Sequence, residues 1–181
     1  LIRRAVCGHE PTGLHAVFKR LWTDCSKKPT AASVSEAIKN HRTVVWPKKE
    51  EFQQAIESRP LYGAAITPYL LLQYDLSLKG DFPTNPTWIE HVLPDKPDDA
   101  WFRQFSPEQH EDLKDTLANL IPLTEEMNRS LSNKPYAKKK PSYQKDAAFK
   151  SAREFAEENE EWTPELLQKR AKKLSKWALG R

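Results

Sequence analysis

The stretch Trp88-Ile89-Glu90-His91-Val92-Leu93-Pro94 is the most informative part of the chain, because an apolar run there carries two adjacent polar side chains. The run predicts a short strand over residues 87–93. Pro94 favours an end to that strand, since proline has no backbone N–H for a ladder hydrogen bond. Neighbouring side chains of a regular strand point to opposite faces. Glu90 and His91 can therefore serve one site only where the strand ends or twists.

Two asparagines follow this pair along the chain. Asn119 opens a second apolar run, residues 119–123, which is short enough to be a strand. Asn128 comes nine residues later, in a helix that we expect to begin at Thr124. The predicted order is thus strand, loop, strand and helix. It places Glu90 and His91 at the end of one strand, Asn119 at the edge of the next, and Asn128 on the following helix.

This combination of side chains suits metal-dependent hydrolysis of a phosphodiester. A neutral imidazole such as that of His91 can take a proton from water near pH 7. A hard divalent cation can stabilise the leaving oxygen, and it prefers oxygen ligands such as the carboxylate of Glu90 and the amide oxygen of Asn128. Each residue alone also has a structural explanation: most histidines do no catalysis, and Asn128 could be an ordinary polar residue of a first helical turn. Their common order favours a nuclease site.

The rest of the sequence predicts a mainly α protein. An apolar stripe through Leu14, Val17 and Leu21 is typical of a helix, and Ser33 can cap the next one with Glu36 as its capping-box partner. We expect Trp101 and Trp162 to be core residues. We expect the histidines other than His91 to lie at the surface, namely His9, His15, His41 and His110. Helices are predicted over 1–25 with a break near Gly13, after Ser33, after Pro47, from Thr67, over 108–117, over 147–161 and from Pro164 onward.

The composition excludes several classes of protein. Five glycines and fourteen prolines in 181 residues leave no glycine-rich nucleotide-binding loop of the usual kind. Two cysteines, Cys7 and Cys25, are too few for a disulfide framework and favour a reduced, cytoplasmic protein. There is no signal peptide and no apolar run of about 18 residues, so no membrane partner is expected. The chain starts at Leu1, inside a helical pattern, and we expect it to be a fragment of a longer protein.

Charge is unevenly distributed although the net charge is only +4. Residues 81–126 carry three basic and eleven acidic groups, whereas residues 134–150 carry six lysines and one aspartate. An acidic block beside a basic one suits a cation site next to a polyanion-binding surface, although solvated faces give the same pattern. Tyrosines among the lysines favour contact with a nucleic-acid backbone. The DNA- or phosphate-binding residues predicted from this segment are Lys134, Lys138, Lys139, Lys140 and Tyr143.

These motifs resemble known nucleases. The acid–histidine pair with Asn119 and Asn128 resembles the HNH group of ββα-metal (His-Me finger) nucleases. The wider pattern is more similar to the C-terminal nuclease domain of GmrSD-type modification-dependent restriction enzymes, a family that includes SspE-like phage-defence proteins. It differs from the family at Ala118 and at Ile121-Pro122, where Gly and a Thr-Leu pair are usual. The resemblance also covers residues 1–8, Gly13-Leu14, Trp101, Ser132-Asn133-Lys134, Tyr136, Lys139-Lys140, Tyr143, Trp162-Thr163-Pro164-Glu165 and Arg170.

The resemblance implies a role for each site residue. His91 would be the general base, and Glu90 and Asn128 would be metal ligands. Asn119 would brace the loop that orients His91, and Lys139 would contact phosphate. An asparagine in place of the family's last histidine implies a site for Mg²⁺ or Mn²⁺ rather than for tightly bound Zn²⁺.

The expected protein is a mainly α domain with a small embedded ββα-metal motif. Its parts would be an N-terminal helical region over 1–80, closed by Lys79-Gly80-Asp81-Phe82-Pro83, a nuclease core over 81–145 and C-terminal helices over 146–181. The resemblance implies an endonuclease or nickase acting on double-stranded DNA in defence against phage. It also implies a covalently linked N-terminal NTPase-like sensor of modified DNA. The alternatives are a catalytically silent DNA-binding module and a helical protein-interaction domain.

Overall fold

The computed structural model describes residues 1–10, 12–25, 27–41, 44–81 and 87–180. Within it the chain forms two compact units, Leu1–Ala55 and Ile56–Arg181. The division lies at 55/56 rather than at the predicted 80/81, because α5 (Thr67–Ser77) packs on β2 (Leu120–Leu123) and on α9 (Lys150–Glu158) of the second unit. Phe82 and Pro83, expected to close the N-terminal part, are outside the described residues.

The first unit is built from helices. They are α1 (Ile2–Val6), α2 (Leu14–Asp24), α3 (Ala31–Lys39) and most of α4 (Lys49–Ser58). Leu14 and Val17 of α2 are buried with Val44, which gives this unit a small core of its own. The N-cap of α3 is Thr30, not the predicted Ser33. Ser33 is the capping-box partner instead, because its hydroxyl oxygen accepts a hydrogen bond from the backbone N–H of Thr30 at 2.9 Å.

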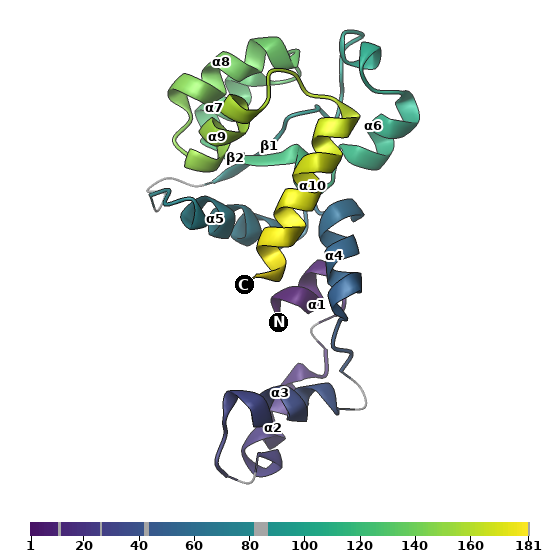
Figure 1. Ribbon diagram of the computed structural model, residues 1–181, viewed down its shortest axis with the longest axis vertical. Helices are drawn as coiled ribbons and strands as arrows, with labels where there is room; N and C mark the ends of the chain where they lie inside the picture. Colours follow the sequence, from purple (N-terminus) through teal and green to yellow (C-terminus); the bar gives the residue numbers. More distant parts are fainter. Residues whose placement is uncertain (11, 26, 42–43, 82–86, 181) are drawn as a thin grey trace. The chain divides into compact units, whose positions relative to one another are not determined.

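The second unit contains a two-stranded antiparallel sheet, so the prediction of a mainly α protein with a small sheet is confirmed (Figure 1). Strand β1 (Trp88–His91) is shorter than the predicted 87–93, and it pairs with β2 (Leu120–Leu123) in a register that places Glu90 opposite Ile121 and His91 opposite Leu120. β1 therefore ends at the acid–histidine pair, as a site shared by these two neighbours requires. Pro122 lies opposite Ile89 in an outer strand of this small sheet, where a missing donor is tolerated.

Helices surround this sheet. A helix contacts each strand, α7 (Glu125–Leu131) at β1 and α9 at β2 (Figure 1). In addition, α10 (Pro164–Leu179) packs on η2 (Leu117–Asn119), just before β2. Residues 136–146, predicted only as a basic segment with interleaved tyrosines, form a regular helix that contains Pro141. The elements of this unit after α5 and besides the strands are η1 (Trp101–Arg103), α6 (Pro107–Leu113), η2 (Leu117–Asn119), α7 (Glu125–Leu131), α8 (Tyr136–Asp146), α9 (Lys150–Glu158) and α10 (Pro164–Leu179).

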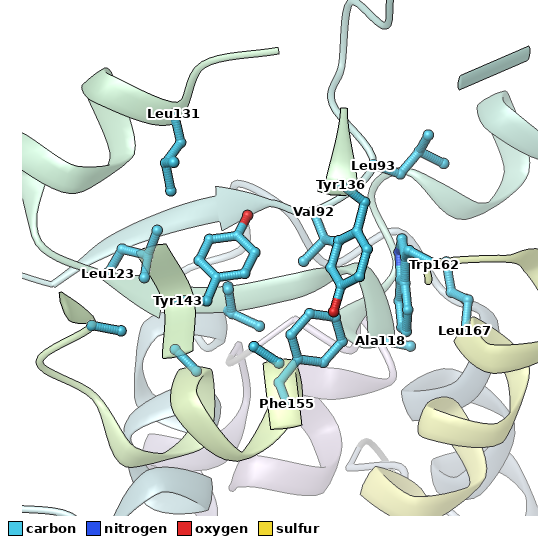
Figure 2. Close-up of a cluster of buried hydrophobic side chains, with 14 of the residues drawn as sticks. Val92, Leu93, Ala118, Leu123, Leu131, Tyr136, Tyr143, Phe155, Trp162 and Leu167 are labelled. Atoms are coloured by element: carbon cyan, nitrogen blue, oxygen red, sulfur yellow. The ribbon is translucent and has the colours of Figure 1, made fainter. Parts of the chain in front are cut away.

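The core of the second unit lies between the sheet and helices α7–α10 (Figure 2). Trp101 and Trp162 are buried there, as predicted. His110 is also buried, contrary to prediction, because its Nε2 is 2.8 Å from the carbonyl oxygen of Pro94 and fixes the chain after β1. Among the described residues, no helix combines the length and apolarity that crossing a membrane requires.

Candidate functional site

A pocket of about 360 Å³ opens at the end of β1. It brings together Glu90 and His91 with Asn128, which comes from the first turns of α7. Three of the four residues of the predicted centre thus share one hollow. The lining is Tyr62, Ile89, Glu90, His91, Pro94, Asp95, Lys96, Asn128, Ser132 and Asn133.

The imidazole of His91 is held by a carboxylate. Its Nε2 lies 2.9 Å from Oδ1 of Asp115, and the ring of Tyr62 is 4.0 Å away between centroids. The backbone N–H groups of Leu61 and Tyr62 both donate to the carbonyl of Asp115, at 2.8 and 3.1 Å. Tyr62 and Asp115 are therefore fixed to each other as well as to the imidazole. Neither Tyr62 nor Asp115 was predicted as a site residue. Within the acidic segment 81–126, nothing in the sequence distinguishes Asp115 from the other acidic residues.

Asn119 is fully buried, is not among the residues that line the pocket, and connects three segments. Its Oδ1 accepts hydrogen bonds from the backbone N–H of Leu93 at 2.8 Å and from Nε1 of Trp162 at 3.1 Å. Its Nδ2 donates to the carbonyls of Leu93 and Lys114, at 2.8 and 2.7 Å. These bonds tie the chain just after His91 to the chain just before β2.

Arg170 of α10 also holds the chain around Asn119. Its Nη1 donates to the carbonyl oxygens of Ala118 and Leu120, the residues on either side of Asn119, and the guanidinium lies over the ring of Phe155 at 4.7 Å. Burial lowers the pKa of Arg170 to about 10. The departure from the family pattern at Ala118 leaves this bond intact, since Arg170 binds the backbone and not a side chain.

Glu90 is buried and held at one oxygen. Its Oε1 accepts hydrogen bonds from Nζ of Lys139 and from the hydroxyl of Tyr143, each at 2.7 Å. Nζ of Lys139 also donates to the carbonyls of His91 at 2.9 Å and Val92 at 3.3 Å. Burial raises the pKa of Glu90, and the nearby ammonium of Lys139 opposes that rise. Burial likewise raises the pKa of Tyr143.

The five residues predicted to bind DNA or phosphate divide into three that are covered and two that are exposed. Lys139 and Tyr143 are fully buried and donate hydrogen bonds to Glu90. Their side chains therefore contact the Glu90 carboxylate in place of the phosphate that the sequence predicts. Lys140 is largely covered and pairs with Glu160. Lys134 and Lys138 are exposed. Fewer lysines are therefore exposed near the pocket than the sequence indicates.

The donors in the pocket fit a hard cation. The residues that line it include two with carboxylates, Glu90 and Asp95, and two with amide oxygens, Asn128 and Asn133, and these are oxygen ligands of the kind that Mg²⁺ and Mn²⁺ prefer. Within the part of the chain that the structure describes, no three His, Cys, Asp or Glu side chains come together as a metal cluster. Mg²⁺ is usually bound through one or two carboxylates and keeps several of its waters.

Fold and site together define a mainly helical domain whose small sheet ends in a pocket with a carboxylate, an imidazole and an amide. Residues 46–177 match the family described as GmrSD restriction endonucleases, C-terminal domain, and the chain belongs to that family. Comparisons with curated proteins and with solved structures found no match. Membership makes this a domain of restriction-endonuclease type, a nuclease with DNA as its substrate.

Proposed function

We propose that this domain is a metal-dependent DNA endonuclease or nickase, with β1, β2 and α7 acting as a ββα-metal motif. The observation that carries the proposal is the pocket at the end of β1, where Glu90, His91 and Asn128 meet in a member of a restriction-endonuclease family. A carboxylate, an imidazole and an amide in one hollow are what water activation beside a cation requires.

His91 is the proposed general base. With Nε2 donating to Asp115, the neutral ring carries its lone pair on Nδ1, which can accept a proton from the attacking water. Asp115 also stabilises the imidazolium that forms. Asn119 positions the backbone after His91 through its two hydrogen bonds to Leu93, so it orients the base without touching substrate.

Glu90 and Asn128 are the proposed ligands of Mg²⁺ or Mn²⁺. The bound ion would supply a Lewis acid for the phosphate and the leaving oxygen. The side chains themselves would hold the ion next to the base. With one carboxylate and one amide as the proposed ligands, the affinity would be modest. DNA would approach over the exposed Lys134 and Lys138, whose charges attract the backbone without reading sequence.

The wider role follows from the family. We propose that the domain works in defence against phage or other foreign DNA, as one part of a longer protein. An N-terminal NTPase-like sensor in that protein would recognise the modification, and the domain described here would cut.

The test is plasmid nicking by the chain and by His91→Ala, with Mg²⁺, with Mn²⁺ and with a chelator. Loss of a general base lowers the rate about 10²- to 10⁴-fold, while DNA binding in a mobility-shift assay stays as in the parent. His15→Ala, which changes an exposed histidine, is the matched control. A His91→Ala variant that nicks like the parent contradicts the assignment of the base.

Two further outcomes separate the rival functions. A chain that binds DNA but nicks it under none of these conditions is a silent DNA-binding module. A chain that binds no DNA at low salt, where electrostatic attraction is strongest, has no nucleic-acid function, and a protein-interaction role then remains.

A further inference from the structure

We propose that Lys139 and Tyr143 are positioning residues that hold Oε1 of Glu90 and leave Oε2 for the cation. This inference deepens the proposed function and rests on Glu90 being a metal ligand. The two residues act through Glu90 and not on the DNA, which is a different role from the phosphate contact that the sequence suggests.

The geometry puts both donors on the same oxygen. Nζ of Lys139 and the hydroxyl of Tyr143 each lie 2.7 Å from Oε1, and Oε2 takes part in neither bond. Glu90 nevertheless contributes to the wall of the pocket. A carboxylate fixed in this way offers the pocket one oxygen, so it suits monodentate binding of a hard cation.

The same lysine links the carboxylate to the backbone beside the base. Its Nζ also bonds the carbonyl oxygens of His91 and Val92. One buried ammonium thus fixes the distance between the proposed metal ligand and the chain that carries the proposed base. A surface lysine bound to phosphate could not do this.

Lys139 and Tyr143 together form a clamp on Glu90, and both residues come from one helix. Lys139 and Tyr143 are four residues apart on α8, which places their side chains on the same helix face, toward β1. Both are fully buried, and the ring of Tyr143 packs edge-on against Phe155 of α9 at 6.4 Å between centroids (Figure 2). Side chains packed in this way lose little further freedom when a cation binds.

A purely structural role explains this arrangement poorly. A buried ion pair carries a large desolvation cost, and well-packed apolar side chains of similar size usually stabilise a core as well or better. A Glu–Lys–Tyr cluster under the wall of a pocket is instead typical of the outer shell that orients a metal ligand. Losing one such partner commonly weakens metal binding 10- to 100-fold.

The experiment measures Mn²⁺ binding to the full chain from the electron paramagnetic resonance signal of free Mn²⁺, so that the readout does not depend on catalysis. Tyr143→Phe removes only the hydroxyl on Glu90, and we expect it to raise the Mn²⁺ Kd at least about tenfold. Tyr136→Phe is the matched control, because Tyr136 is buried on the same helix and its hydroxyl donates to the carbonyl of Asn159 instead. We expect that variant to bind Mn²⁺ within about twofold of the parent.

Lys139→Gln, which removes the ammonium, gives a second reading in the same assay. It is expected to weaken Mn²⁺ binding as well, even though a positive charge has been removed from beside the ion. Tyr143→Phe and Lys139→Gln variants that both bind like Tyr136→Phe overturn the clamp while leaving the nuclease intact. A parent chain that binds no Mn²⁺ overturns the metal site itself, and the clamp with it.

Discussion

The buried pair of Glu90 and Lys139 should show strong energetic coupling. Lys139→Met leaves the Glu90 carboxylate buried with Tyr143 as its remaining hydrogen-bond donor on Oε1, and breaking a buried ion pair in this way costs about 3–5 kcal/mol. In Glu90→Gln/Lys139→Met no buried charge of the pair remains. The double variant then loses mainly the hydrogen bonds to the His91 and Val92 carbonyls, about 1 kcal/mol each.

These figures predict a double variant that is more stable than Lys139→Met alone, by about 1–3 kcal/mol. The assay is urea unfolding of the parent, both single variants and the double variant, followed by near-ultraviolet circular dichroism. That signal reports on Trp162 and other aromatic side chains packed in the core around the site. Coupling is read from the four unfolding free energies.

Two results would contradict the predicted coupling between Glu90 and Lys139. If the two single variants simply add, the ammonium and the carboxylate do not depend on each other, and the reasoning that places a charged pair in this core is wrong. If Lys139→Met is as stable as the parent, the lysine is not held in the core, and a surface role for it regains support.

Three other perturbations test separate parts of the site. Asp115→Asn removes the charge that orients and stabilises the ring of His91, so nicking should slow at least about tenfold while DNA affinity in a mobility-shift assay is unchanged. Lys134→Ala with Lys138→Ala should weaken DNA binding about equally for all sequences, and a plot of log K against log salt should become shallower by about one unit for each phosphate that the variant no longer neutralises; an unchanged slope would place the DNA elsewhere. Ser132, which lines the pocket, has a φ of +47° that side chains rarely adopt, so Ser132→Gly should raise the unfolding free energy by about 1 kcal/mol in urea titrations, and a loss of stability would contradict the strain.

The strands and helix starts of this fold could be predicted because short sequence patterns indicate them. The apolar runs indicated β1 and β2, and Thr124 and Pro164 indicated the starts of α7 and α10. Such signals depend only on residues close together in the sequence, so they can be recognised without knowledge of the tertiary structure.

The contacts that complete the site could not be predicted, since they join distant positions. Glu90 and Lys139 are 49 residues apart, and His91 and Asp115 are 24 apart. Charged residues are rarely buried unless they are paired, so a lysine-rich segment is normally assigned to the surface. Here the spacing of Lys139 and Tyr143 on a helix carried the relevant information, but Pro141 between them made a helix improbable.

The hydrogen bonds that Trp162 and Arg170 make around Asn119 have a consequence for biosynthesis. A ribosome releases Glu90, His91, Asn119 and Asn128 well before these two residues, which hold the Asn119 side chain and the carbonyls on either side of it. The loop that carries the base is therefore secured only after α10 has emerged and docked. We expect a nascent or truncated chain that lacks α10 to be unable to cut DNA. Incomplete chains would then not damage the DNA of the cell that makes the protein.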